Sequence, residues 1–163
     1  MADSDHGAGG VIPANSPDGA PGPGVPQLLN VSPVWLAQVA SAVRAGFPSP
    51  AEDLGATRID ILDKIILHPS ATYVMRVSGD SMVGYGIFDD DILLVDRAIR
   101  PRHGHIVVAN LDNEFVVKYL WKKNGAIKLK AGNPTFADIV PKEGQTLHVW
   151  GVVLTSIKTF NVH

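Results

Sequence analysis

The feature that most constrains the fold is a series of short apolar runs that fills the chain after residue 72. The runs are rich in β-branched residues and have the length of typical strands. Turn residues separate several of them, as at Asp112-Asn113 and Asn124-Gly125. No regular alternation with helical segments is visible, which favours a mainly β, mostly antiparallel fold over a doubly wound one. The predicted strands are residues 73–77, 92–96, 105–111, 114–120, 126–131 and 147–160.

The N-terminal part of the chain is built differently. Residues 1–27 are rich in glycine and proline and contain no aromatic residue. Such a stretch has little to bury, so we predict a disordered leader. Further on, Trp35, Val39 and Val43 recur four residues apart. This spacing predicts a short amphipathic helix over residues 32–44.

A second helical pattern lies between Arg58 and Pro69. Its isoleucines and leucine fall on one face of a helix, at Ile61, Leu62, Ile65 and Ile66. Asp60 is a suitable N-terminal cap, and Pro69 lies just past the end. The β-branched residues of the run fit a strand as well. We predict a short helix here.

The totals limit the classes of function. The 163 residues suggest one domain with a tail, and the net charge of −2 carries no global signal for nucleic-acid binding. The chain has no cysteine, which excludes disulfides and thiol catalysis and fits a reducing compartment. No apolar run approaches the ~20 residues that span a bilayer, and the N-terminus lacks the pattern of a secretory signal. We therefore expect a cytoplasmic protein without a membrane segment.

Ser81 is the first candidate for chemistry, because it follows a Gly79-Asp80 turn directly after a predicted strand. A serine at this place either caps the turn or acts as a nucleophile, and a nucleophile needs a proton acceptor. Six histidines are present. A Ser-His-Asp triad stays open, because its members need not be close in the sequence.

Lys118 is the sharper candidate for the proton acceptor. Side chains alternate between the faces of a strand, so its neighbours line both faces. All of them are apolar: Val116, Leu120, Phe115, Val117 and Tyr119. Burial among them would lower the pKa of the lysine, and the neutral amine could act as a general base. The alternative is that Lys118 extends its charged end to water near Lys122.

Two groups of residues could suggest a metal, and for both we predict none. His103 and His105 alternate along a strand, but no third ligand stands at a recognisable spacing. The three aspartates at 89–91 lack the ligand spacing of a calcium-binding EF-hand loop. We expect no cofactor and interpret the aspartates as a solvated turn.

Several segments in order resemble the UmuD proteins, which belong to the LexA-like self-cleaving Ser-Lys peptidases. The segments are GDSM, GIFDDDILLVDRAI, EFVVKYL, NPTF and VWGVVLTSIK, and the resemblance runs from about residue 44 to the C-terminus. It implies a LexA/UmuD-like peptidase fold with Ser81 as nucleophile and Lys118, 37 positions later, as general base. For the oxyanion hole we expect the backbone amides of Asp80 and Ser81 at the turn.

The resemblance also implies a cleavage site. The family cuts its own chain before a glycine, and in UmuD proteins a phenylalanine follows that glycine. Here this points to the bond between Ala45 and Gly46. UmuD proteins usually have Cys-Gly at this bond, and Ala-Gly is more like LexA. Residues 1–45 would then be a removable arm, and residues 46–163 would form the peptidase and dimerisation domain.

The partners implied by the resemblance are those of the DNA-damage response. A RecA filament on single-stranded DNA would stimulate cleavage, and the processed homodimer would bind a Y-family polymerase and support translesion synthesis. The removed arm carries a charge of −2, from Asp3, Asp5, Asp18 and Arg44, so residues 46–163 are neutral and contact with DNA should be indirect. Alternatives are a LexA-type repressor, which needs an N-terminal DNA-binding domain, a non-cleaving dimeric polymerase scaffold, and a signal peptidase, for which a membrane anchor is missing.

Overall fold

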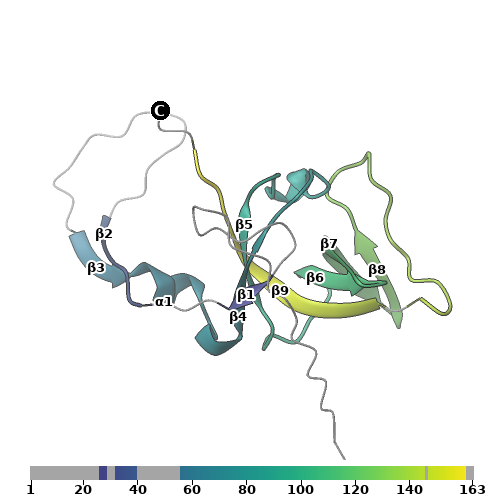
Figure 1. Ribbon diagram of the computed structural model, residues 1–163, viewed down its shortest axis with the longest axis horizontal. Coiled ribbons are helices and arrows are strands. Elements are labelled where there is room, and N and C mark those ends of the chain that lie inside the picture. The colour runs from purple at the N-terminus through teal and green to yellow at the C-terminus, as the bar shows by residue number, and fades with distance from the viewer. Residues whose placement is uncertain (1–25, 29–31, 40–55, 146, 161–163) are drawn as a thin grey trace, which may run out of the picture.

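A computed structural model describes residues 26–28, 32–39, 56–145 and 147–160 of the chain. Its main body is a seven-stranded antiparallel sheet in the order β1-β4-β5-β9-β6-β7-β8 (Figure 1). The strands are β1 Gln27–Leu28, β4 Thr72–Arg76, β5 Ile92–Asp96, β6 Ile106–Leu111, β7 Glu114–Lys123, β8 Ala126–Lys130 and β9 Leu147–Ile157. The predicted mainly β, antiparallel fold is confirmed.

All six predicted strands are present, with ends that differ by a few residues. The largest differences are at β7, which continues beyond residue 120 to Lys123, and at β9, which ends at Ile157. The turns between them use the predicted residues. Asn113, before β7, has φ 70°, and Asn124, before β8, has φ 49°, so both adopt the left-handed conformation of tight hairpins.

The last strand, β9, lies in the middle of the sheet between β5 and β6, and Figure 1 shows it as the long yellow strand. The register shifts where β9 passes Leu94 and Val95 of β5, and again at Val108 and Ala109 of β6. Gly151 of β9 lies between these two register shifts. A Cβ atom at this position would overlap with the Val95 side chain, which explains the glycine. β9 therefore joins one half of the sheet, β1-β4-β5, to the other half, β6-β7-β8.

Two buried clusters cover the faces of β7. Phe115, Val117 and Tyr119 pack against the first cluster, which contains Met75, Met82, Leu93 and Val108. Leu120 belongs to the second cluster, with Val107, Leu129 and Val152, and Val116 packs against it. The prediction that apolar groups line both faces of β7 around Lys118 is confirmed.

The helix predicted over residues 32–44 is wrong for the part that the structure describes. Trp35–Val39 is strand β2, and it pairs with β3, Ala56–Asp60, in a separate two-stranded sheet that lies apart from the main sheet in Figure 1. The side chains of residues 32–38 are exposed. A short helix needs a buried apolar face to be stable, and this segment has none, so backbone pairing with β3 prevails.

The second predicted helix is confirmed over part of its length. α1 spans Ile61–Ile65, and Asp60 caps it as predicted, because its carboxylate accepts a hydrogen bond of 3.0 Å from the Leu62 amide. Arg58 and Ile59 belong to β3 instead, so the β-branched signal prevailed there. Within the described segments, no helix has the length and apolar character needed to cross a membrane.

The predicted disorder of the leader is wrong at its last residue. Gln27 lies in β1 and pairs with Val74 of β4. An edge strand of two residues carries no recognisable sequence pattern, which is why it was not predicted. Residues 1–25 lie outside the described residues.

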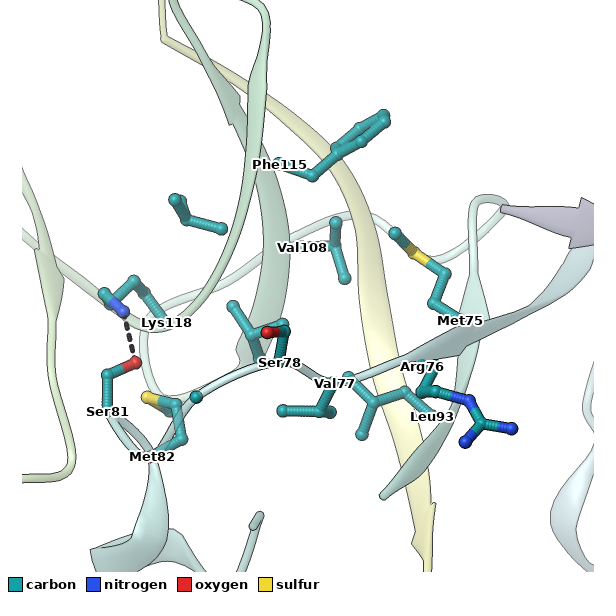
Figure 2. Close-up of a pocket in the computed structure, with 13 residues that line it drawn as sticks. Met75, Arg76, Val77, Ser78, Ser81, Met82, Leu93, Val108, Phe115 and Lys118 are labelled. Carbon is teal, nitrogen blue, oxygen red and sulfur yellow. Dashed lines mark hydrogen bonds between the residues drawn. The ribbon is translucent and has the colours of Figure 1, made fainter. Parts of the chain in front are cut away.

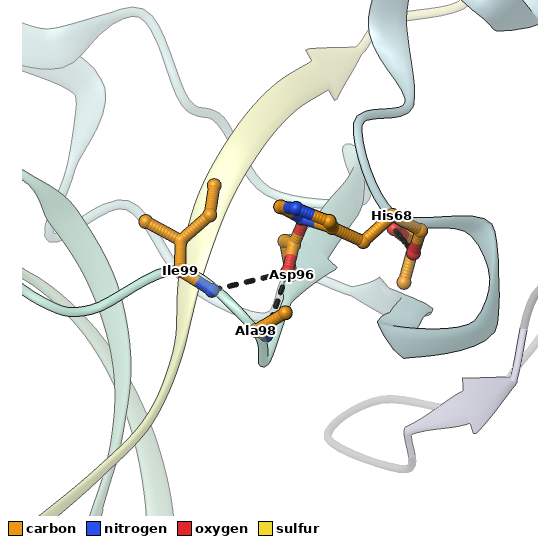
Figure 3. A network of polar contacts seen from close by, with 5 residues as sticks. His68, Asp96, Ala98 and Ile99 are labelled. Atoms are coloured by element: carbon orange, nitrogen blue, oxygen red, sulfur yellow. Dashed lines mark hydrogen bonds and ion pairs between the residues drawn. The ribbon is translucent and has the colours of Figure 1, made fainter.

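A buried aspartate holds the segment that follows α1 against the main sheet (Figure 3). Asp96, at the end of β5, is fully buried and accepts hydrogen bonds from the amides of Ala98 (2.7 Å) and Ile99 (3.3 Å). Its second oxygen accepts a 2.7 Å hydrogen bond from Nδ1 of His68, in the segment between α1 and β4. The carboxylate thus holds both the turn after β5 and the connection from the N-terminal part.

Replacing Asp96 with alanine is expected to lower the free energy of unfolding by about 1–3 kcal/mol, because it leaves two partly buried amides without this acceptor. Asp96→Asn keeps an acceptor for the two amides, so its loss should be clearly smaller. Urea denaturation of both variants measures the difference. Equal losses would contradict the role assigned to these hydrogen bonds.

Candidate active site

Ser81 lies on a tight turn between β4 and a short 3₁₀ helix, η2, Val83–Tyr85. Gly79 has φ 93°, a conformation that residues with a side chain rarely adopt. Its amide donates a 2.7 Å hydrogen bond to the carboxylate of Asp89. The turn therefore has a defined shape, and it presents Ser81 as a half-buried residue at its end.

Lys118 faces Ser81 from strand β7. Its Nζ donates a hydrogen bond of 2.6 Å to Ser81 Oγ, and Figure 2 shows the two side chains pointing at each other. In the sheet, Lys118 is paired with Val107, which is fully buried. The structure thus brings together the two side chains that the sequence singled out.

The environment of Lys118 disfavours its charged form. The residue is only 8% exposed. Burial lowers the pKa of its amine below the ordinary value. Among the described residues, no carboxylate forms an ion pair with it. The alternative that Lys118 extends to water is wrong, since its amine is buried against Ser81.

A cavity of about 180 Å³ opens beside the serine. Ser81, Lys118, Arg76 and Ser78 contribute polar groups to its lining, and the other side chains labelled in Figure 2 are apolar. These are Met75, Val77, Met82, Leu93, Val108 and Phe115. A space of this size and polarity suits a small apolar side chain next to the reactive hydroxyl.

A histidine base for Ser81 finds no support within the described residues. The one His-Asp ion pair there is His68–Asp96. Asp96 pairs with Thr72 at the beginning of β4, whereas Ser81 follows the end of that strand. His103 and His105 are engaged elsewhere, since their Nδ1 atoms accept hydrogen bonds from the amides of Lys122 and Arg102. None of the histidines that the structure describes lines the cavity.

The loop after β8 contributes contacts that the sequence reasoning missed. The Gly132 amide donates a 2.8 Å hydrogen bond to the carbonyl oxygen of Ser81. The side-chain amide of Asn133 donates a 3.2 Å hydrogen bond to the carbonyl oxygen of Asp80. The Asn133-Pro134 pair was a visible turn signal, but it did not indicate which distant segment the loop would contact.

The remaining predicted site residues stay predictions. Within the described part of the chain, the backbone amides of Asp80 and Ser81 donate no hydrogen bond to another backbone group. Ala45 and Gly46 lie outside the described residues.

A serine on a tight turn, a buried amine at hydrogen-bond distance and an adjacent small apolar cavity are the arrangement expected of a serine hydrolase with a lysine base. A mainly antiparallel β scaffold carries this arrangement. The family model named Peptidase S24-like matches residues 37–154, well over half of the chain, so the chain belongs to the Peptidase S24-like family. This is a family of self-cleaving serine peptidases linked to the SOS response.

Individual relatives agree with this assignment. The protein ImpA of Escherichia coli is 39% identical over 115 residues, which cover 70% of this chain and 77% of ImpA. The protein SamA of Salmonella typhimurium is 41% identical over 113 residues, which cover 69% of this chain and 78% of SamA. The LexA repressor of Xylella fastidiosa is 40% identical over 114 residues, covering 70% of this chain and 54% of the repressor. The predicted relation to UmuD-like proteins is confirmed.

Proposed function

We propose that this chain is a self-cleaving serine endopeptidase of the SOS response that cuts its own Ala45–Gly46 bond. The observation that supports it most is the 2.6 Å hydrogen bond between the buried Lys118 amine and Ser81 Oγ. A buried amine with a lowered pKa is neutral in a larger fraction of molecules than a free lysine is, and only the neutral form can accept a proton.

The proposed reaction proceeds in two steps. Neutral Lys118 takes the hydroxyl proton as Ser81 Oγ attacks the carbonyl carbon of Ala45, and the resulting ammonium gives that proton to the leaving amine of Gly46. This leaves an ester between Ala45 and Ser81. Lys118 then takes a proton from water, whose hydroxide attacks the ester, and the proton returns to Ser81. The amides of Asp80 and Ser81 would bind the oxyanion in both steps.

The cavity beside Ser81 supports the proposed cleavage site. Its mostly apolar lining suits the methyl side chain of Ala45, and its volume of about 180 Å³ leaves room for that group. Because the bond belongs to the same chain, docking makes the attack effectively unimolecular, and modest intrinsic catalysis is sufficient.

The processed form, residues 46–163, would act as a homodimeric accessory subunit of a Y-family translesion polymerase in the cytoplasm. A RecA filament on single-stranded DNA would favour the docked, cleavable state. The similarity to ImpA and SamA supports this role over that of a repressor. The matched region covers most of those two proteins but only 54% of the LexA repressor.

The test is incubation of the full-length protein with RecA, single-stranded DNA and a nucleotide that sustains the filament, followed by mass spectrometry. We expect one new pair of fragments, ending at Ala45 and beginning at Gly46, formed faster than without the filament. The same mixture without nucleotide is the control. A different cleaved bond, or no response to the filament, would contradict the corresponding part of the proposal.

A further inference from the structure

The loop after β8 is fitted closely to the turn that carries Ser81. Gly84, in η2, donates a 2.8 Å backbone hydrogen bond to the Gly132 carbonyl oxygen, and Gly132 donates in return to the Ser81 carbonyl oxygen. A Cβ atom on Gly84 would overlap with the Gly132 carbonyl, and one on Gly132 would overlap with the ring of Tyr85. The two backbones therefore meet at a distance that only glycine permits at position 84, and the ring of Tyr85 leaves no room for a side chain at position 132.

Asn133 adds an oriented side-chain contact to this junction. Its Oδ1 accepts hydrogen bonds from the backbone amide (3.1 Å) and the hydroxyl (2.9 Å) of Thr135. A backbone amide can only donate, so this pair identifies the oxygen of the Asn133 side chain. Its Nδ2 consequently faces Asp80, where it donates the 3.2 Å hydrogen bond to the carbonyl oxygen.

This contact sets the direction of the Ser81 amide. The peptide between Asp80 and Ser81 is planar and trans, so its carbonyl and its N–H point in opposite directions. When Asn133 holds the Asp80 carbonyl, the Ser81 N–H must point away from the loop. The Gly132 amide holds the following peptide, between Ser81 and Met82, in the same way, because it donates a hydrogen bond to the Ser81 carbonyl.

We propose that Asn133 is a positioning residue for self-cleavage: it holds the Asp80–Ser81 peptide so that the Ser81 amide is directed at the oxyanion. The inference rests on the proposed function and adds a residue 53 positions away in the sequence from the residue it contacts. Within the described part of the chain, Asn133 forms no hydrogen bond with Lys118, so we expect it to serve charge stabilisation and to leave proton transfer unchanged.

Asn133→Asp is the most direct test, because it keeps the shape and the acceptor for Thr135 but replaces the donor with an oxygen that repels the Asp80 carbonyl. We expect the maximal self-cleavage rate at alkaline pH to fall about 10- to 100-fold. Asn133→Ala adds no charge, so its rate should fall within the same range with the midpoint of the pH profile unchanged. Thr135→Val should give a smaller loss in the same direction, and Thr159→Val, near the C-terminus, serves as its matched control.

A second readout does not depend on the scissile segment. An organophosphorus probe that labels reactive serines should modify Ser81 in the full-length protein, and labelling of the Asn133 variants should slow in parallel with cleavage. Thermal unfolding identifies any variant that fails to fold. If Asn133→Asp fails to fold, the cleavage and labelling rates of Thr135→Val test the proposal instead.

Two outcomes would overturn the inference. One is a folded Asn133 variant that cleaves and labels within about twofold of wild type, a change too small for a lost positioning contact. The other is a shifted pH midpoint at an unchanged maximal rate, which would assign Asn133 to proton transfer. If wild-type protein reacts no faster than Ser81→Ala in either assay, the proposed function itself fails, and the role of Asn133 with it.

Discussion

Replacing Lys118 with methionine is expected to reduce self-cleavage by roughly 10³-fold or more, because the base that accepts the Ser81 proton is gone. Methionine is apolar and of similar length, so it fills the same buried space. Ser81→Ala should reduce cleavage at least as much, since the nucleophile is removed. Both are measured by following the Gly46 fragment over time.

The same variants separate catalysis from folding. Lys118→Met removes a buried amine, so we expect the free energy of unfolding at neutral pH to stay the same or rise by about 1 kcal/mol. Lys128→Met, at an exposed position of the neighbouring strand β8, is the matched control and should cleave at the wild-type rate. Formation of the fragment by pure Lys118→Met at the wild-type rate would refute the assignment of the base.

The rate of self-cleavage without RecA is expected to rise with pH, about tenfold per unit, until Lys118 is largely deprotonated. Burial lowers the pKa of this amine, so the plateau should begin below the ~10.4 at which a free lysine titrates. Initial rates at pH values from about 6 to about 10.5, with the fold monitored by circular dichroism, measure the profile. A rate that stays flat over this range would count against a lysine base.

Stability should change with pH in the same direction. In the window between the lowered pKa of Lys118 in the folded state and its ordinary value in the unfolded state, the unfolded chain binds more protons. The free energy of unfolding therefore rises with pH across that window, and the cost of burying the amine disappears at its upper end. Lys118→Met should lack this rise. The comparison with wild type therefore separates the contribution of Lys118 from the titration of other groups.

The sheet and the paired side chains could be predicted because their signals are local. Asn113 and Asn124 mark hairpins whatever lies around them, and the apolar residues on both sides of Lys118 indicate burial without knowledge of the fold. The helix predicted over residues 32–44 failed because periodicity reports which face could be buried and not whether a partner exists. Its described residues pair with β3 and contact the start of α1 through Val34, but the side chains of residues 32–38 remain exposed.

Asn133 could not have been assigned from its neighbours in the sequence. Its pattern with Pro134 and Thr135 predicts a turn, and the structure has one. The function we propose for Asn133 depends on its hydrogen bond to Asp80. Asp80 follows β4, which is distant in the sequence from β8 and its loop. Contacts of this kind depend on the order of strands in the sheet, which hairpin signals leave undetermined.

The central place of β9 has a consequence for how the protein is made. Ser81 follows a strand on one side of β9, Lys118 belongs to a strand on the other side, and β9 is the last strand to be synthesised. A nascent polypeptide lacks the strand that unites the two halves until residues 147–157 have left the ribosome. Under the proposed function, we therefore expect unfinished molecules to be unable to cut themselves until translation of the sheet is complete.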